Sequence, residues 1–96
     1  MKLNSDRPIK DVLKELIETY HLEGKLNEVK VIHSWEKVVG EMIARHTKNL
    51  YIKDGKLFVK IDSPALKNEL IYSTSTIIEN LNAEAGTKVV EEVIFL

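Results

Sequence analysis

A chain of 96 residues and 11.0 kDa has room for one modest hydrophobic core, and its 44% hydrophobic and 30% charged residues are typical of a folded globular domain. The absence of cysteine excludes disulfides, thiolate metal sites and a cysteine nucleophile. The net charge of -1 argues against a uniformly cationic nucleic-acid binder, although an average can hide a segregated surface. Because no apolar run approaches the ~20 residues that span a bilayer, we expect no membrane association and a cytoplasmic location.

The N-terminal part of the chain predicts an amphipathic helix. Ser5 or Asp6 is the candidate cap, Pro8 lies in the first turn, and the helix is expected to end near Gly24. The apolar residues at helical spacing are Ile9, Val12, Leu13, Leu16, Ile17 and Tyr20.

A second helix follows, with a longer apolar stripe. Its members are Val31, Ile32, Trp35, Val38, Val39, Met42 and Ile43. Gly40 interrupts this segment, where the absence of a Cβ permits a close approach or a bend. Trp35 is expected in the core because it shares the stripe.

Two short apolar runs around Asp54-Gly55 predict a β-hairpin with a type I′ turn, because both turn positions tolerate positive φ. This turn fixes the register. The facing pairs are then Lys53 and Lys56, Ile52 and Leu57, Tyr51 and Phe58, Leu50 and Val59, and Asn49 and Lys60. Side chains alternate along a strand, so the core face is expected to hold Leu50, Ile52, Leu57, Val59 and Ile61, and the other face Tyr51, Lys53, Lys56, Phe58 and Lys60.

The C-terminal part predicts a helix and a closing strand. Ser63-Pro64 caps and starts the helix, which ends at Gly86 and whose stripe is Leu66, Leu70, Ile71, Ile77, Ile78 and Leu81. The polar run at 73–76 competes for backbone hydrogen bonds and predicts a joint between two shorter helices. The closing strand is expected over Lys88 to Leu96.

These elements predict a single α+β domain over residues 8–96, preceded by a tail over residues 1–7. The order is helix, helix, strand, strand, helix, strand. The helices are expected to pack on one face of a small three-stranded sheet.

Charge is segregated along the chain. Residues 45–60 carry five basic side chains against one acidic one, whereas residues 61–96 carry two against six. The basic residues of the hairpin region are Arg45, Lys48, Lys53, Lys56 and Lys60. Lysines around the facing pair Tyr51 and Phe58 resemble the device by which proteins stack unpaired bases and hold phosphates. Two other roles stay open: a pair that only stabilises the hairpin, and a protein interface beside Phe95 or Val93.

Catalytic chemistry has little support in the sequence. The three histidines, His21, His33 and His46, are scattered and have no zinc-helix spacing. No G-x-S-x-G, P-loop or G-x-G-x-x-G motif occurs. We therefore expect no catalytic residue, no cofactor and no metal; an enzyme would need a pocket that unites His33 or His46 with an acid.

An ordered set of short motifs resembles the DciA family of bacterial replication proteins over residues 9–96. The set consists of Trp35, Val38-Val39-Gly40, His46-Thr47, Asp54-Gly55, Leu57, Val59, Ser63, Glu69-Leu70 and Leu81-Asn82, followed by a hydrophobic strand. The resemblance implies a KH-like domain, assistance to a replicative DnaB-type helicase, and affinity for DNA. The run at 73–76 stands where an RNA-clamping KH domain has a G-x-x-G loop, so RNA clamping is not expected.

The first hypothesis is therefore a noncatalytic accessory protein with two partners, the replicative DnaB-type helicase and single-stranded DNA. The residues assigned to the DNA are Arg45, Lys48, Tyr51, Lys53, Lys56, Phe58 and Lys60. The alternative is a protein-interaction or homodimerisation module that uses the same aromatic face without nucleic acid.

Overall fold

The computed structural model describes residues 8–96, and within this range the chain forms five helices and three strands, in the predicted α+β order. The elements are α1 (Ile9–Thr19), α2 (Glu23–Val39), α3 (Glu41–Arg45), β1 (Thr47–Lys53), β2 (Lys56–Ile61), α4 (Pro64–Ile71), α5 (Thr74–Ala85) and β3 (Glu92–Phe95). The proposed tail and the candidate caps Ser5 and Asp6 lie outside the described residues.

The sheet is mixed, with strand order β1-β2-β3. β1 and β2 are antiparallel, and every facing pair predicted from the turn is confirmed. Asp54 and Gly55 have φ of 52° and 75°, as a type I′ turn requires. β3 pairs with β2 in parallel, because α4 and α5 together form the crossover that returns the chain to the same end of the sheet.

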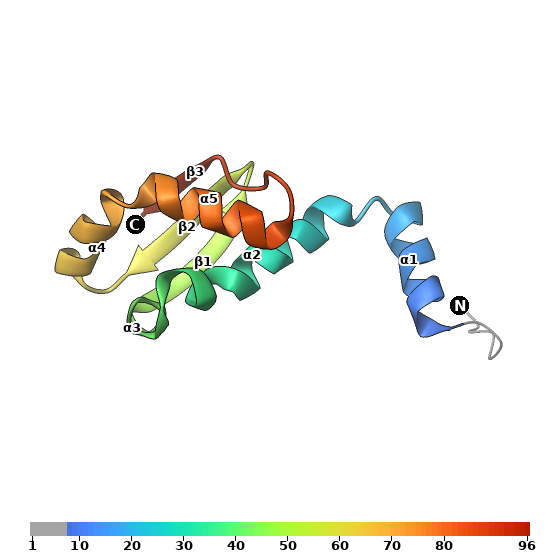
Figure 1. The fold of residues 1–96 in the computed structure, drawn as a ribbon, viewed down its shortest axis with the longest axis horizontal. Helices are drawn as coiled ribbons and strands as arrows, with labels where there is room; N and C mark the ends of the chain where they lie inside the picture. Colours follow the sequence, from blue (N-terminus) through green and yellow to red (C-terminus); the bar gives the residue numbers. More distant parts are fainter. Residues whose placement is uncertain (1–7) are drawn as a thin grey trace.

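One face of the sheet carries the core. Figure 1 shows α2 and α5 lying across this face, while α1 stands apart beyond the first turns of α2. The buried core residues are Val31, Trp35, Leu57, Val59, Ile61, Leu70, Ile77, Leu81, Ala85, Val90 and Val93. Trp35 is 4% exposed, and its Nε1 donates to Thr47 Oγ1 at 3.0 Å, which joins α2 to the start of β1. The core expectation for Trp35 is confirmed.

Asn82 on α5 holds the segment that leads into β3. Its Oδ1 accepts hydrogen bonds from the N–H groups of Val89 and Val90, each at 2.9 Å, and its Nδ2 donates to Val90 O at 3.0 Å. These bonds hold the backbone of 89–90 against the helix, so the closing strand is limited to Glu92–Phe95 and is shorter than predicted.

Two glycines mark corrections to the predicted helices. α1 ends at Thr19, well before Gly24, which lies in the first turn of α2. Gly40 has φ of 93° and ends α2, and an added Cβ there would meet no atom within 4 Å. Gly40 is therefore a bend and not a close approach. The bend removes Met42 from the predicted stripe, and its side chain is exposed on α3.

The predicted joint in the C-terminal helix is confirmed. α4 ends at Ile71 and α5 begins at Thr74, whose Oγ1 donates to Ile71 O at 2.7 Å. This hydroxyl competes for a helix carbonyl, as expected of the polar run. Ser63 caps α4 by accepting a hydrogen bond from Leu66 N. Ile71, which was predicted on the apolar stripe, is exposed because it lies at the joint.

Within residues 8–96, no helix is both long enough and apolar enough to cross a membrane.

Candidate nucleic-acid interface

The sheet face opposite the core, called the open face here, is formed by alternate residues of the three strands. The residues on it are Asn49, Tyr51, Lys53, Lys56, Phe58, Lys60, Glu92 and Ile94. Tyr51 and Phe58 stack on each other, with ring centroids 4.8 Å apart and planes 10° from parallel. Tyr51 is exposed and Phe58 is half-buried, so the pair presents an aromatic surface to solvent.

Three exposed lysines surround the stacked rings. Lys56 and Lys60 lie on β2 on either side of Phe58, each about 7 Å along the strand from it. Lys53 faces Lys56 across the hairpin. Within the described part of the chain, none of these three ammonium groups has an ion pair. The like charges repel, which favours an anionic ligand between them.

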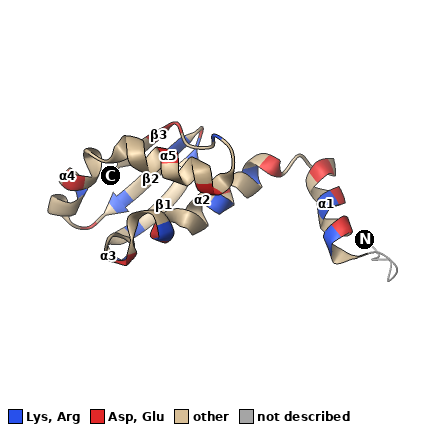
Figure 2. Ribbon diagram, in the orientation of Figure 1, with Lys and Arg blue, Asp and Glu red and all other residues tan. Residues whose placement is uncertain are grey.

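Acidic residues border the open face on one side. Glu92 of β3 lies beside Lys56 in the parallel register, and Glu91 N donates to Gly55 O at 2.8 Å. Both acids therefore lie at the turn end of the hairpin. Figure 2 shows lysine and arginine segments on the hairpin strands, as the charge distribution predicts. The positive charge is strongest on β1 and β2, away from β3.

Two of the seven predicted site residues are not on the open face. Lys48 is one residue out of step with Tyr51 and Lys53, so it does not share their face, and its Nζ lies 3.3 Å from Asp62 Oδ2. Arg45 is the last residue of α3, off the sheet. The structure brings the other five together: Tyr51, Lys53, Lys56, Phe58 and Lys60.

Asp62 forms a charged cluster that sequence reasoning missed. His46 Nδ1 lies 2.6 Å from Asp62 Oδ1, and this hydrogen bond is the main cause that lowers the pKa of the Asp62 carboxyl, with Lys48 adding to it. Asp62 N also donates to His46 O at 3.0 Å. The register set by the turn places Thr47 opposite Asp62, and the shift between Thr47 and Asn49 brings His46 there in its place.

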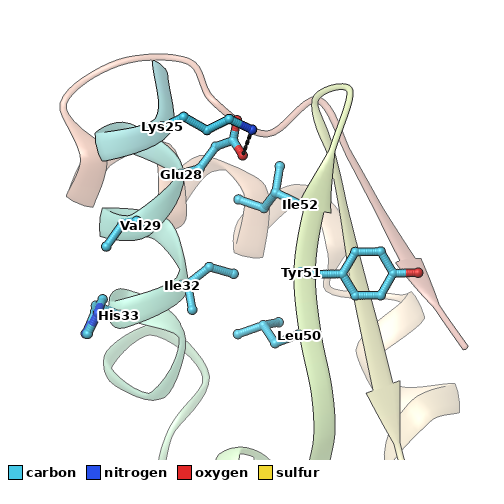
Figure 3. Close-up of a pocket in the computed structure, with 8 residues that line it drawn as sticks. All are labelled: Lys25, Glu28, Val29, Ile32, His33, Leu50, Tyr51 and Ile52. Atoms are coloured by element: carbon cyan, nitrogen blue, oxygen red, sulfur yellow. Dashed lines mark ion pairs between the residues drawn. The ribbon is translucent and has the colours of Figure 1, made fainter. Parts of the chain in front are cut away.

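A groove between α2 and β1 is the second feature that the sequence did not indicate. Its volume is about 340 Å³, and it is lined by Lys25, Glu28, Val29, Ile32, His33, Leu50, Tyr51 and Ile52. Figure 3 shows Ile32, Leu50 and Ile52 converging between helix and strand, whereas Tyr51 points to the other side of β1. β1 is an edge strand, so its outer backbone edge borders the groove unpaired by another strand.

The sequence predicted an exposed protein interface beside Phe95 or Val93, and these two residues are wrong. Val93 is buried and Phe95 packs against the core, because both fall on the core side of β3. Ile94 is the β3 residue beside Phe58 on the open face. An apolar contact surface on this face would therefore combine Tyr51, Phe58 and Ile94.

The histidines do not assemble a catalytic pocket. His46 meets Asp62 on the surface, and His33, although it lines the groove, is directed away from the groove in Figure 3. Within residues 8–96, no three His, Asp or Glu side chains gather closely enough to hold a metal ion.

The chain is similar to one described protein family and to two UPF0232 proteins. The sequence model of the family described as "Dna[CI] antecedent, DciA" matches residues 8–95. The chain is 36% identical over 62 residues to a UPF0232 protein of Corynebacterium glutamicum (strain R), which covers 65% of this chain and 35% of that protein. It is also 36% identical over 67 residues to a UPF0232 protein of Rhodococcus jostii, with 70% and 36% covered. The chain thus spans little more than a third of these relatives.

Proposed function

We propose that this chain, which belongs to the DciA family, is a noncatalytic DNA-replication accessory protein of the cytoplasm that associates with a replicative DnaB-type helicase and contacts single-stranded DNA. Family membership supports the helicase part. The observation that carries the DNA part is the stacked pair Tyr51 and Phe58, exposed among three lysines without ion pairs.

Single-stranded DNA fits this surface better than a duplex does. Unpaired bases offer their faces to aromatic side chains, and each stacked base contributes ~1 to 3 kcal/mol. In a duplex the bases already stack on each other, so only phosphates would remain for the lysines. The open face is a flat sheet surface with no recognition helix on it, and therefore lacks the usual element for a major groove.

The other two predicted cations have different roles in this proposal. Lys48 is engaged by Asp62 and is expected to contribute less to DNA binding than Lys53 or Lys56. Arg45, at the end of α3, extends the positive surface beyond the hairpin and would contact a longer DNA strand.

We also propose that the domain is KH-like but binds nucleic acid through its sheet, because the α4–α5 joint carries hydroxyl side chains in place of a glycine loop.

The DNA part is tested by fluorescence anisotropy with a labelled oligonucleotide over a salt series. Lys53→Glu combined with Lys56→Glu should weaken binding and reduce the slope of log K against log salt by about 1.4, because two phosphate contacts are lost. The matched control is Lys30→Glu with Lys67→Glu, which changes the charge equally on α2 and α4. Equal binding by the hairpin variant and the control would rule out the open face as the DNA site.

The helicase part requires a separate measurement. Size-exclusion chromatography with light scattering, on a mixture with the replicative helicase of the source organism, should show co-elution with or without single-stranded DNA. Failure to co-elute at low salt in both conditions would refute the helicase association while leaving DNA binding to stand on its own test.

The alternative function is a protein-interaction or homodimerisation module that uses the open face. The observation that favours it is Ile94, which extends the aromatic pair into a continuous apolar strip across β1, β2 and β3. Tyr51→Ser with Phe58→Ser would then disrupt a protein complex or dimer that forms in the absence of DNA. A protein that binds single-stranded DNA through intact lysines would favour the first function.

A further inference from the structure

α1 presents exposed apolar side chains along one stripe, although Val12 on the same helix is buried. Ile9 is 72% exposed and Leu13 is 53% exposed, and Tyr20 continues the stripe at the C-terminal end. Within residues 8–96, no α1 side chain belongs to the core cluster. The stripe residues Ile9, Leu13 and Ile17 line a surface hollow of about 730 Å³ together with charged neighbours on α1 and Glu23.

The turn after α1 is built so that the helix stands away from the body. His21 has a positive φ of 55°, and Leu22 N donates to Ile17 O at 3.0 Å, the bond that closes a Schellman motif. α2 starts at once, since Leu26 N donates to Leu22 O at 3.0 Å. The connection of residues 20–22 is hydrogen-bonded on both sides and fixes the direction of α1, which lies beyond the N-terminal end of α2 and apart from the sheet in Figure 1.

The chain exposes more surface than a compact monomer of its mass. A compact monomer of 11.0 kDa exposes about 5,600 Å², whereas this chain exposes 6934 Å². The excess is about 1,300 Å², and a stable protein interface takes ~800 Å² from each partner. The radius of gyration is 16.4 Å, against about 12.5 Å for a compact domain of this length.

The groove between α2 and β1 matches α1 in chemistry and size. Its floor is aliphatic, from Ile32, Leu50 and Ile52, and Val29 at its margin is 49% exposed. The part of α2 that lines the groove, from Lys25 to His33, is about 12 Å long, and α1 is about 16 Å long. The lengths and the apolar character therefore suit a helix laid into a groove.

Both apolar surfaces have mixed charges at their margins, with Asp11 and Glu18 beside the lysines of α1 and Lys25 beside Glu28 of the groove. Lys10 and Lys14 lie one turn apart along the edge of the α1 stripe that ends in Ile17. On α2, Glu28 and Glu36 lie one turn before and one turn after Ile32 on the same row. Glu28 lines the groove and lies 3.8 Å from Lys25, so a lysine of the docked helix would share this carboxylate with Lys25.

We propose that α1 of this chain docks into the α2–β1 groove of a second copy. The α1 of the second copy docks into the groove of the first, so the two copies form a two-fold symmetric dimer with exchanged helices. One helix and one groove per copy satisfy both interfaces, as closed symmetry requires. This inference goes beyond the proposed function, because it concerns a surface distinct from the open face. The dimer would offer two open faces to one DNA strand, which raises the local concentration of the second site.

The first test is the mass of the full 96-residue chain by light scattering over a concentration series. The expected result is a rise from 11.0 kDa to twice that mass. Leu13→Glu places a charge on the apolar stripe of α1, and Val29→Glu places a charge at the margin of the groove. Each variant alone should remain monomeric where the unaltered chain is dimeric, with a dimer dissociation constant raised about tenfold or more.

Mixing the two variants gives the decisive result. A Leu13→Glu chain keeps its groove and a Val29→Glu chain keeps its α1, so a mixture retains one complete interface and should form a heterodimer that neither variant forms alone. Tyr72→Glu is the control, because Tyr72 is an even more exposed apolar residue at the end of α4, away from both surfaces, and its substitution should leave dimerisation unchanged.

The outcomes against the proposal are equally definite. A chain that stays monomeric at every concentration, a dimer that both variants still form, or a mixture that does not associate would each overturn it. Circular dichroism of each variant checks folding, and neither substitution removes a core contact, because Leu13 and Val29 lie outside the core cluster.

Discussion

The two faces of the sheet are made by the same strands, yet they differ in almost every physical property. On β2, Leu57 and Val59 are fully buried, while the alternate residues Lys56 and Lys60 are exposed. The core face contributes free energy of folding through apolar burial. The open face contributes little stability and keeps aromatic and cationic groups accessible. A chain of this size can therefore change its binding surface without changing its core, because alternation separates the two along every strand.

The largest expected effect is on the core face. Trp35→Ala should lower the free energy of unfolding by ~3 to 5 kcal/mol, because it leaves a cavity beneath α2 and leaves Thr47 without its indole donor. Urea unfolding followed by circular dichroism measures it. Met42→Ala on exposed α3 is the control, with an expected change within about 0.5 kcal/mol. Equal effects of the two substitutions would contradict the assigned core.

A smaller effect is expected at the polar contact that positions β3. Asn82→Ala should cost ~1 to 3 kcal/mol, because the N–H of Val90, a fully buried residue, loses its acceptor. Asn80→Ala, on the exposed side of α5, should change stability little. Thermal unfolding of both variants compares them. If the two midpoints coincide, the loop before β3 is not held by Asn82.

The smallest effect is expected at the surface cluster beside the open face. Hydrogen bonding to His46 lowers the pKa of Asp62 below its ordinary 3.8, so the carboxylate stabilises the folded chain at pH values above 3.8. This contribution is lost as the pH falls through the folded-state pKa. Asp62→Asn should be slightly less stable at neutral pH, and the difference should disappear in acid. Urea unfolding over a pH series measures it, and a difference that grows in acid would contradict the sign.

Local patterns predicted much of the fold. Asp54-Gly55 determined the turn, the turn determined the register, and the register determined which side chains share a face. The polar run at 73–76 also predicted the α4–α5 joint. The predicted open face follows from the same reasoning, and its five predicted residues lie together in the structure.

The remaining features depend on contacts between distant segments. The apolar stripe of α1 indicated that this helix must bury one face, but periodicity does not say against what, and the structure places the stripe outside the core. The groove arises only because β1 is an edge strand beside α2. Lys48 and Arg45, which were assigned to the DNA together with the five residues of the open face, lie off that face, because Lys48 is one residue out of step with Tyr51 and Arg45 ends a helix.

The sequence by itself thus determined the elements, the hairpin register and the residues of the open face, because each depends on steric and hydrogen-bonding preferences within a few residues of the chain. Only the tertiary structure decided that β3 pairs in parallel beside β2, that Asp62 draws Lys48 and His46 together, and that α1 stands apart from the body. Those outcomes depend on how a single core of limited size is shared among helices, and the core of α2, α5 and the sheet leaves no place for α1.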